Sequence, residues 1–207
     1  MILKFLDLDS QKQNRILNAA MKEFAQKGYK NASTNEIVKE AGISKGLLFH
    51  YFAKKKDLFL YLYDYSLEIF TIEFFQRIDL VEKDIFKRIR QMALLKIDLI
   101  KKHPELYNFL YKAIIEDTPE VKEDLEQKNK QLLTNGYAKI FRDIEVKKFK
   151  ETIDTDKVIN IVIWTIEGFS NQILEKIKSQ YPNELHYEKI SKELDVYLKF
   201  LESAFYK

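Results

Sequence analysis

Hydroxyl and ammonium side chains gather in one short stretch near the N-terminus. Thr34, Ser44 and Tyr51 supply hydroxyl groups, and Lys45 and the run Lys54–Lys56 supply positive charge. These groups, together with the exposed backbone N–H groups of helix starts, are donors that bind phosphate. The residue types therefore suit contact with a nucleic-acid backbone, although Lys54–Lys56 also fits an ordinary solvated link between two helices.

Two short helices around a glycine would position these groups. The first is predicted to start at Ser33-Thr34-Asn35-Glu36, a capping box in which Ser33 and Glu36 satisfy each other's backbone N–H groups. Gly42 ends it and tolerates the positive φ of a tight turn, and Ser44 is placed to cap the next helix, Lys45 to Phe52. This is the pattern of a helix-turn-helix, whose second helix lies in the major groove of DNA, and also of an ordinary helical hairpin.

Apolar residues at helical spacing continue along the chain. A first helix is predicted to be capped by Ser10 and to end at Gly28, before a short polar linker, Tyr29–Ala32. A long fourth helix is expected from about Asp57 to Phe75. Later helices are expected over 85–99, from Pro104, over 119–141, over 156–179 and over 190–205. The sequence thus predicts an all-α fold of about nine helices and no strand.

Composition excludes several classes of chemistry. The 207 residues include no Cys, which rules out disulfides, zinc–thiolate sites and a cysteine nucleophile. The three histidines, His50, His103 and His186, lie far apart in the sequence, and no glycine-rich phosphate loop or Gly-x-Ser-x-Gly motif occurs. We therefore expect a protein that is not an enzyme and has no metal or cofactor.

The charge distribution predicts a basic N-terminal module, and the hydropathy predicts no membrane-spanning segment. Residues 1–60 hold eleven Lys or Arg against six Asp or Glu, whereas the remainder holds 24 against 26. A basic N-terminal module suits a phosphate-bearing partner. No apolar run approaches the roughly 18 residues that a membrane span needs, and no signal segment is recognisable. We expect a cytoplasmic location.

The segment Thr34–Leu58, which reads TNEIVKEAGISKGLLFHYFAKKKDL, closely resembles the signature of the TetR/AcrR family of transcriptional regulators. The preceding Arg15–Ala20, followed by Phe24 and Gly28 at the family spacing, resembles it too. The resemblance covers about residues 10–60. It implies a DNA-binding domain over 10–71, with the helix-turn-helix at about 34–53, and an all-helical effector-binding and dimerisation domain over 72–207.

The resemblance also implies a set of DNA-contacting residues. Thr34 would bind phosphate, Asn35 phosphate or a base edge, and Lys45 either guanine or phosphate. Tyr51 and Lys55 match phosphate-binding positions of the family. The full set of DNA-contacting positions is Thr34, Asn35, Ser44, Lys45, Gly46, Leu47, Phe49, His50, Tyr51 and Lys55.

Two positions depart from the family pattern. Leu47 stands where Thr is common, so a hydrogen bond is replaced by apolar contact, for example with a thymine methyl. Phe49 stands where Tyr is usual, which removes another hydroxyl group. His50 is either close to DNA or an exposed side chain without a role. The resemblance therefore implies the docking mode but not the operator sequence.

The second domain is expected to form the dimer and to enclose an effector. The 156–179 helix is apolar almost all round near its start, which suits packing against both its own domain and a partner subunit, or a central place in a monomeric bundle. Family resemblance favours a homodimer. Aromatic and polar side chains that either line an effector site or fill the core are Phe70, Phe74, Tyr107, Tyr111, Trp164 and Asn171.

Three functions remain open to this sequence. The resemblance implies a repressor that a small, largely apolar effector releases from a palindromic double-stranded DNA operator. The same fold also suits a DNA-binding protein that is controlled by a protein partner or acts architecturally, without a small ligand. A helical adaptor that has lost DNA binding is a third interpretation, and the retained Thr34, Lys45, Tyr51 and Lys55 argue against it.

Overall fold

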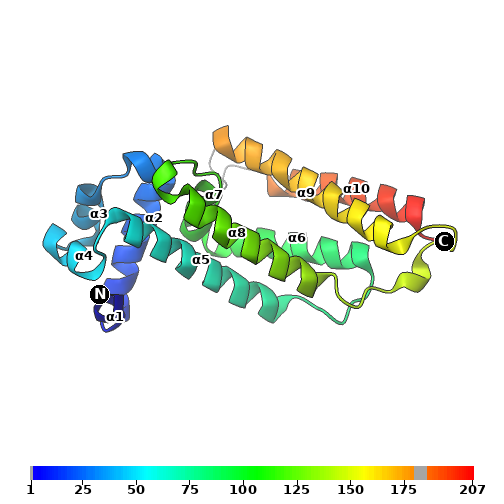
Figure 1. The fold of residues 1–207 in the computed structure, drawn as a ribbon, viewed down its shortest axis with the longest axis horizontal. Helices are drawn as coiled ribbons and strands as arrows, with labels where there is room; N and C mark the ends of the chain where they lie inside the picture. Colours follow the sequence, from blue (N-terminus) through cyan, green and yellow to red (C-terminus); the bar gives the residue numbers. More distant parts are fainter. Residues whose placement is uncertain (1, 180–185) are drawn as a thin grey trace. The chain divides into compact units, whose positions relative to one another are not determined.

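The computed structural model describes residues 2–179 and 186–207, which are almost entirely helical (Figure 1). The helices of this part of the chain are α1 (Ile2–Leu6), α2 (Ser10–Asn31), α3 (Thr34–Ala41), α4 (Lys45–Tyr51), α5 (Lys55–Arg77), α6 (Ile85–Lys102), α7 (Pro104–Ile114), α8 (Pro119–Ile140), the 3₁₀ turn η1 (Val146–Lys148), α9 (Thr155–Ser179) and α10 (Tyr187–Phe205). Within the same residues, extended backbone pairs only in an isolated bridge between Phe149 and Tyr206. The predicted all-α fold is confirmed, with α1 added to the nine expected helices.

Contacts between Cα atoms divide the chain into two compact units that alternate along the sequence. Unit 1 comprises Met1–Ile72 and His103–Leu132, and unit 2 comprises Glu73–Lys102 and Leu133–Lys207. Unit 1 therefore contains α1 to α4, most of α5, all of α7 and the first part of α8. The units reflect packing within one subunit, so the functional division at residue 71 stays a prediction.

Aromatic side chains form the centre of unit 1, where α2 packs against α3 and α7. The ring of Phe59 on α5 meets Phe24 of α2 at 5.0 Å and Phe109 of α7 at 5.3 Å between centroids, both edge to face. Such pairs add roughly 0.5–1.5 kcal/mol each beyond the burial of their surface. The cluster fixes α2, from which the chain enters the helix-turn-helix.

The unpredicted helix α1 is anchored by a single aromatic side chain. Phe5 is fully buried and packs against Tyr51, Phe52 and Tyr61, with ring centroids 5.8, 5.1 and 5.6 Å away. The side-chain amide of Gln13 donates to the carbonyls of Leu6 and Leu8, at 2.9 and 2.8 Å. These hydrogen bonds hold the connection between α1 and α2 in place.

Two predicted helix caps are wrong. Asp9, not Ser10, caps α2: its carboxylate accepts the backbone N–H of Lys12 at 2.9 Å. Ser33 precedes α3 but makes no side-chain capping bond, and its N–H donates to Glu23 of α2, at 2.9 Å, and not to Glu36. The predicted capping box between Ser33 and Glu36 is thus replaced by a carboxylate ten residues earlier in the chain.

Two segments expected to be links are helical. Residues 29–31 of the predicted linker form one further turn of α2 beyond Gly28, and Tyr29 is buried. Lys55 and Lys56 lie in the first turn of α5, which therefore starts two residues earlier than predicted. The predicted starts at Pro104 and Pro119 are confirmed.

Unit 2 is built on α6, α9 and α10. Its buried core includes Ile85 and Ile89 of α6, Val158 and Val162 of α9, and Leu198 of α10. A buried arginine of α6, Arg88, donates to the carbonyls of Leu80, Glu82, Ile140 and Arg142, which ties the end of α8 to the segment before α6. None of the described helices is both long enough and apolar enough to cross a membrane.

Candidate nucleic-acid interface

The turn between α3 and α4 has the geometry of a helix-turn-helix. Gly42 adopts a left-handed conformation with φ 66° and ψ 40°, and its N–H donates to carbonyls at the end of α3. The next N–H, of Ile43, donates to the Val38 carbonyl at 3.0 Å. Because a side chain at Gly42 would be strained at this φ, glycine permits the tight reversal that sends α4 away from α3.

Ser44 and the first residues of α4 present the polar groups of the turn. The Ser44 hydroxyl accepts the N–H of Leu47 at 3.2 Å and so caps α4. Lys45 and Gly46 are exposed, Leu47 is half-buried, and Leu48 faces the core. The start of α4 thus presents the hydroxyl of Ser44 and the ammonium of Lys45. Because Gly46 has no side chain, another molecule can approach the backbone closely at this position.

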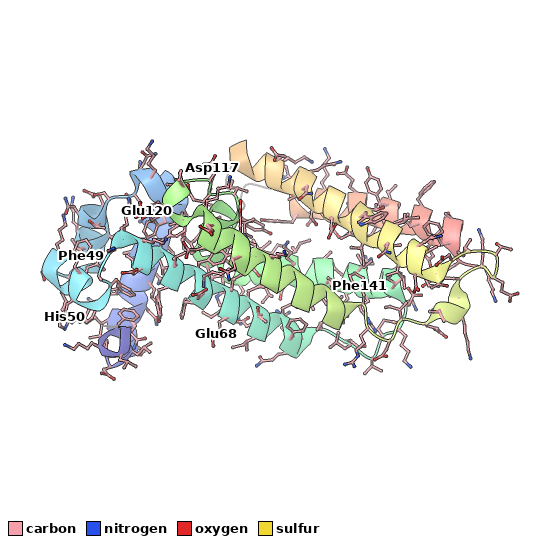
Figure 2. All side chains as sticks on the ribbon, viewed as in Figure 1. Phe49, His50, Glu68, Asp117, Glu120 and Phe141 are labelled. Atoms are coloured by element: carbon pink, nitrogen blue, oxygen red, sulfur yellow. The ribbon has the colours of Figure 1, made fainter. Side chains whose placement is uncertain are left out.

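The far end of α4 is partly built into the core. Phe49 is half-buried and His50 is exposed, and both are labelled on α4 in Figure 2. Tyr51 is only 5% exposed, with its ring against Phe5 and His50. A phosphate contact by Tyr51 would have to be made by its hydroxyl, because the ring is enclosed.

The start of α3 and the start of α5 hold the remaining predicted residues. Thr34 is half-buried and Asn35 is exposed, in the first turn of α3. The ammonium of Lys55 donates to the carbonyls of Lys30 and Ala32, both at 3.2 Å, and lies 4.8 Å above the ring of Tyr29. Two of its three N–H donors are therefore used inside the protein.

The three consecutive lysines have different surroundings. Lys54 is exposed, and its backbone N–H is accepted by Asp57 at 3.1 Å. Lys56 forms an ion pair with Asp124 of α8 at 2.7 Å, and the hydrogen bond to this carboxylate raises the pKa of the Lys56 ammonium. Of the run, Lys54 and Lys55 are the side chains better placed to meet phosphate.

The predicted effector-lining residues are distributed over both units. In unit 1, the ring of Tyr107 lies 5.6 Å from Phe70 and 6.0 Å from Tyr111, and burial raises the pKa of Tyr111. In unit 2, Phe74 is buried beside Phe75. Trp164 is 65% exposed and Asn171 is exposed on α9, so both belong to the surface of a single subunit.

Buried polar groups of unit 1 were missed by the sequence interpretation. The hydroxyl of Tyr63 on α5 donates to Asn129 of α8. Asn108 of α7 is buried among apolar residues, and its side-chain oxygen has no hydrogen-bond partner among the described residues. The signal that could have identified Asn108 is its place in the apolar stretch Leu106–Leu110 of α7.

Comparison with protein families identifies the N-terminal region. Residues 16–62 match the model of the bacterial regulatory proteins of the tetR family. This N-terminal segment is therefore a DNA-binding domain of the TetR family. The match contains α3, the Gly42 turn and α4 in full, so the predicted resemblance is confirmed on the residues that carry it.

Individual relatives are similar to different lengths of the chain. The helix-turn-helix regulator YuxN of Bacillus subtilis (strain 168) is 46% identical over 55 residues, which cover 27% of this chain and 19% of that protein. The fatty acid metabolism regulator protein of the same strain is 26% identical over 164 residues, 75% of this chain and 80% of that one. The chain thus spans about a fifth of the first relative and four fifths of the second.

A solved structure shows the same fold over nearly the full length. The transcriptional regulator FadR from Bacillus subtilis, in complex with stearoyl-CoA, has a TM-score of 0.59 and 19% identity, covering 92% of this chain and 97% of that one. At this identity the similarity establishes a shared TetR fold. The ligand belongs to that structure.

Proposed function

We propose that this TetR-family protein is a dimeric repressor that binds a palindromic DNA operator and is released by a small, largely apolar effector. The observation that carries the proposal is the start of α4, where Ser44, Lys45 and Gly46 are exposed at the head of a helix whose opposite side is buried. A helix held in this way presents its N-terminal residues to base edges in the major groove.

The roles of the DNA-contacting residues follow from their surroundings. Lys45 is free to reach guanine in the major groove, and Leu47 offers apolar contact with a thymine methyl. Thr34 and Asn35 at the start of α3 and the hydroxyl of Ser44 suit phosphate, as does Lys55 with its remaining N–H donor. Phosphate contacts fix the docking of the protein, and contacts to base edges select the sequence.

An apolar surface on unit 2 supports the dimer. Ile161 and Trp164 on α9 and Val196, Tyr197 and Phe200 on α10 are all exposed in the single subunit. Large apolar side chains gathered on two neighbouring helices indicate a protein-binding surface. A second copy placed there would give two recognition helices, which read half-sites roughly 34–36 Å apart when these are one DNA turn from each other.

The first effector class to test is a long-chain acyl thioester. Support comes from the relative named as a fatty acid metabolism regulator and from the similar fold that holds stearoyl-CoA. The buried Tyr107 and Tyr111 and the half-buried Phe70 suit an acyl chain. An effector shifts DNA binding only by its difference in affinity for the two states, typically 1–3 kcal/mol.

The proposal is tested by fluorescence-anisotropy titration against DNA from upstream of the protein's own gene, with a scrambled duplex as control. We expect tight, salt-sensitive binding to one duplex by two subunits. Stearoyl-CoA should weaken it by about five- to 150-fold, whereas free CoA should not. Equal, weak binding to every fragment of a genomic selection would contradict the DNA-binding function. Selective binding that no acyl thioester changes would contradict only the effector class.

A further inference from the structure

The last turn of α2, after Gly28, leads into the helix-turn-helix. Gly28 interrupts α2 with φ 68° and ψ 173°, a conformation essentially restricted to glycine. Residues 29–31 then form one turn, closed by a hydrogen bond from the Ala32 N–H to the Gly28 carbonyl, at 3.2 Å. We call this segment the 29–31 turn. One turn of helix is unstable alone, so its conformation depends on outside partners.

A carboxylate from a distant part of unit 1 binds the first N–H of this turn. The N–H of Tyr29 donates to Oε2 of Glu116, at 2.7 Å. Glu116 lies between α7 and α8, and its other oxygen accepts the N–H of Thr118 at 3.1 Å and the Thr118 hydroxyl. A negative charge at the N-terminus of a helical turn satisfies a donor that has no partner within the turn and suits the helix dipole.

The opposite end of the turn is held by a positive charge. Lys55 donates to the carbonyls of Lys30 and Ala32 and covers the buried ring of Tyr29. The same ammonium is the phosphate-binding group proposed above. The 29–31 turn therefore stands between Glu116 at its start and Lys55 at its end, and its carbonyl positions determine where Lys55 lies.

We propose that Glu116 is a positioning residue for DNA binding. By fixing the N–H of Tyr29, it fixes the 29–31 turn, the location of the Lys55 ammonium and the path of the chain into α3. Glu116 lies outside the segment that matches the family model and inside the predicted effector domain. The inference rests on the proposed DNA-binding function, to which it adds a residue that makes no contact with DNA.

Whether loss of the Glu116 carboxylate weakens or strengthens DNA binding distinguishes a positioning role from a simple change in net charge. Removing an acidic side chain makes a protein more positive, and this alone strengthens its binding to DNA. Loss of the Glu116 contact predicts the opposite, because Lys55 would no longer be held in place for phosphate. Asp117, labelled in Figure 2, provides the matched control, because it is an exposed acidic residue of the same loop.

The experiment compares the wild-type protein with Glu116→Ala, Glu116→Gln and Asp117→Ala, by anisotropy on the selected operator at several salt concentrations. Glu116→Ala should weaken binding roughly tenfold and reduce the salt slope by about one phosphate contact. Glu116→Gln keeps an oxygen that accepts the Tyr29 N–H and should stay within about threefold of wild type. Asp117→Ala should bind equally well or slightly better.

Two further measurements test whether Glu116 acts on Lys55 through the 29–31 turn. In a Lys55→Ala background, Glu116→Ala should cost much less than in the wild type, because both changes remove the same phosphate contact. Hydrogen exchange of the amides of residues 28–33 should accelerate in Glu116→Ala and not in Asp117→Ala. Unchanged exchange would contradict the structural link.

The outcomes distinguish the inference from the function on which it rests. If wild type binds its operator selectively and Glu116→Ala binds as well as Asp117→Ala, positioning by Glu116 is wrong and the repressor proposal stands. The same conclusion follows if Glu116→Ala lowers only the melting temperature, with operator affinity and salt slope unchanged. If wild type shows no selective binding to any DNA, the proposed function and the inference fail together.

Discussion

Individual side chains decide what the start of α4 can read on DNA. The Ser44 hydroxyl accepts the capping hydrogen bond, and the Leu47 side chain has no hydrogen-bonding group, so we expect Lys45 to be the strongest polar reader at this end of the helix. The exposed position of Lys45 suits a base edge, whereas Lys55 is tied to the protein backbone and suits a fixed phosphate. The two lysines should therefore affect DNA binding in different ways.

We expect Lys45→Ala to lower affinity for the operator by about 1–3 kcal/mol and to relax preference at one base pair, because a guanine contact is lost. Lys55→Ala should weaken binding to all duplexes and reduce the salt slope by about one. Anisotropy titrations on the operator and on single-base variants measure both. Equal losses on every duplex after Lys45→Ala would show that Lys45 binds phosphate.

Gly28 should be intolerant of substitution. Gly28→Ala forces an L-residue into a conformation that only glycine adopts readily, and its Cβ would lie 3.2 Å from Oε2 of Glu116. We expect unfolding free energy to fall by about 1–3 kcal/mol, measured by urea denaturation without DNA. Gly46→Ala is the control, because a Cβ at Gly46 meets nothing within 4 Å. It should stabilise α4 by roughly 0.5–1 kcal/mol. Two equal values would contradict the strain argument.

Among the helices, local sequence signals predicted most boundaries and missed those that depend on distant partners. Prolines marked the starts of α7 and α8, and Gly42 marked the turn before α4. The capping box at Ser33 failed because Glu23, from a different helix, binds the Ser33 N–H first. The 29–31 turn was missed for a similar reason, since Glu116 lies 87 residues away from Tyr29.

The first helix illustrates the same limit. Five residues are too few to show helical periodicity, and α1 forms because Phe5 enters the aromatic cluster around Tyr51 and Phe52. The candidate DNA-contacting residues are predicted from a long motif that fixes their positions on two helices. The effector-lining residues rest on a weaker signal, because aromatic residues at helical spacing also fill an ordinary core. Both sets stay predictions.

Removal of the Phe5 side chain should disturb α4 through packing. We expect Phe5→Ala to lower unfolding free energy by about 3–5 kcal/mol, as for other large-to-small changes in a core. In conditions where the variant remains folded, operator affinity should also fall, because Tyr51 and Phe52 at the end of α4 lose their neighbour. Leu6→Ala, at a residue half exposed on the same helix, should change both quantities little. Equal stability of the two variants would mean that α1 is not anchored by Phe5.

At the scale of the whole molecule, the exposed apolar surface of α9 and α10 is the proposed dimer interface. The start of α9 was expected to have neighbours on every side, and in the single subunit Val158 and Val162 are buried while Ile161 and Trp164 are exposed. A second copy would cover the exposed side. Palindromic DNA is read by a two-fold dimer, so the same surface bears on both assembly and DNA affinity.

Charge placed on this surface should separate the subunits. We expect Trp164→Glu and Phe200→Glu each to raise the dimer dissociation constant by roughly 30-fold or more, as loss of a buried aromatic anchor costs about 2 kcal/mol or more. Sedimentation equilibrium measures the dissociation constant, and circular dichroism checks that helix content is kept. Leu94→Glu, at an exposed apolar residue of α6, is the matched control. Dimers that persist in both variants would place the interface elsewhere.

The packing of α7 beside α2 has a consequence for the evolution of new regulators. If DNA-reading heads were exchanged between relatives by recombination at the junction near residue 71, the new head would meet an α7 selected for another partner. Phe109 would then face a foreign α2, and Glu116 would have no matching backbone N–H to bind. Functional hybrids of this protein should therefore arise when α7 and the loop after it come from the same parent as the DNA-binding domain. The segments that must be exchanged together are then separated in the gene by the segment that encodes α6.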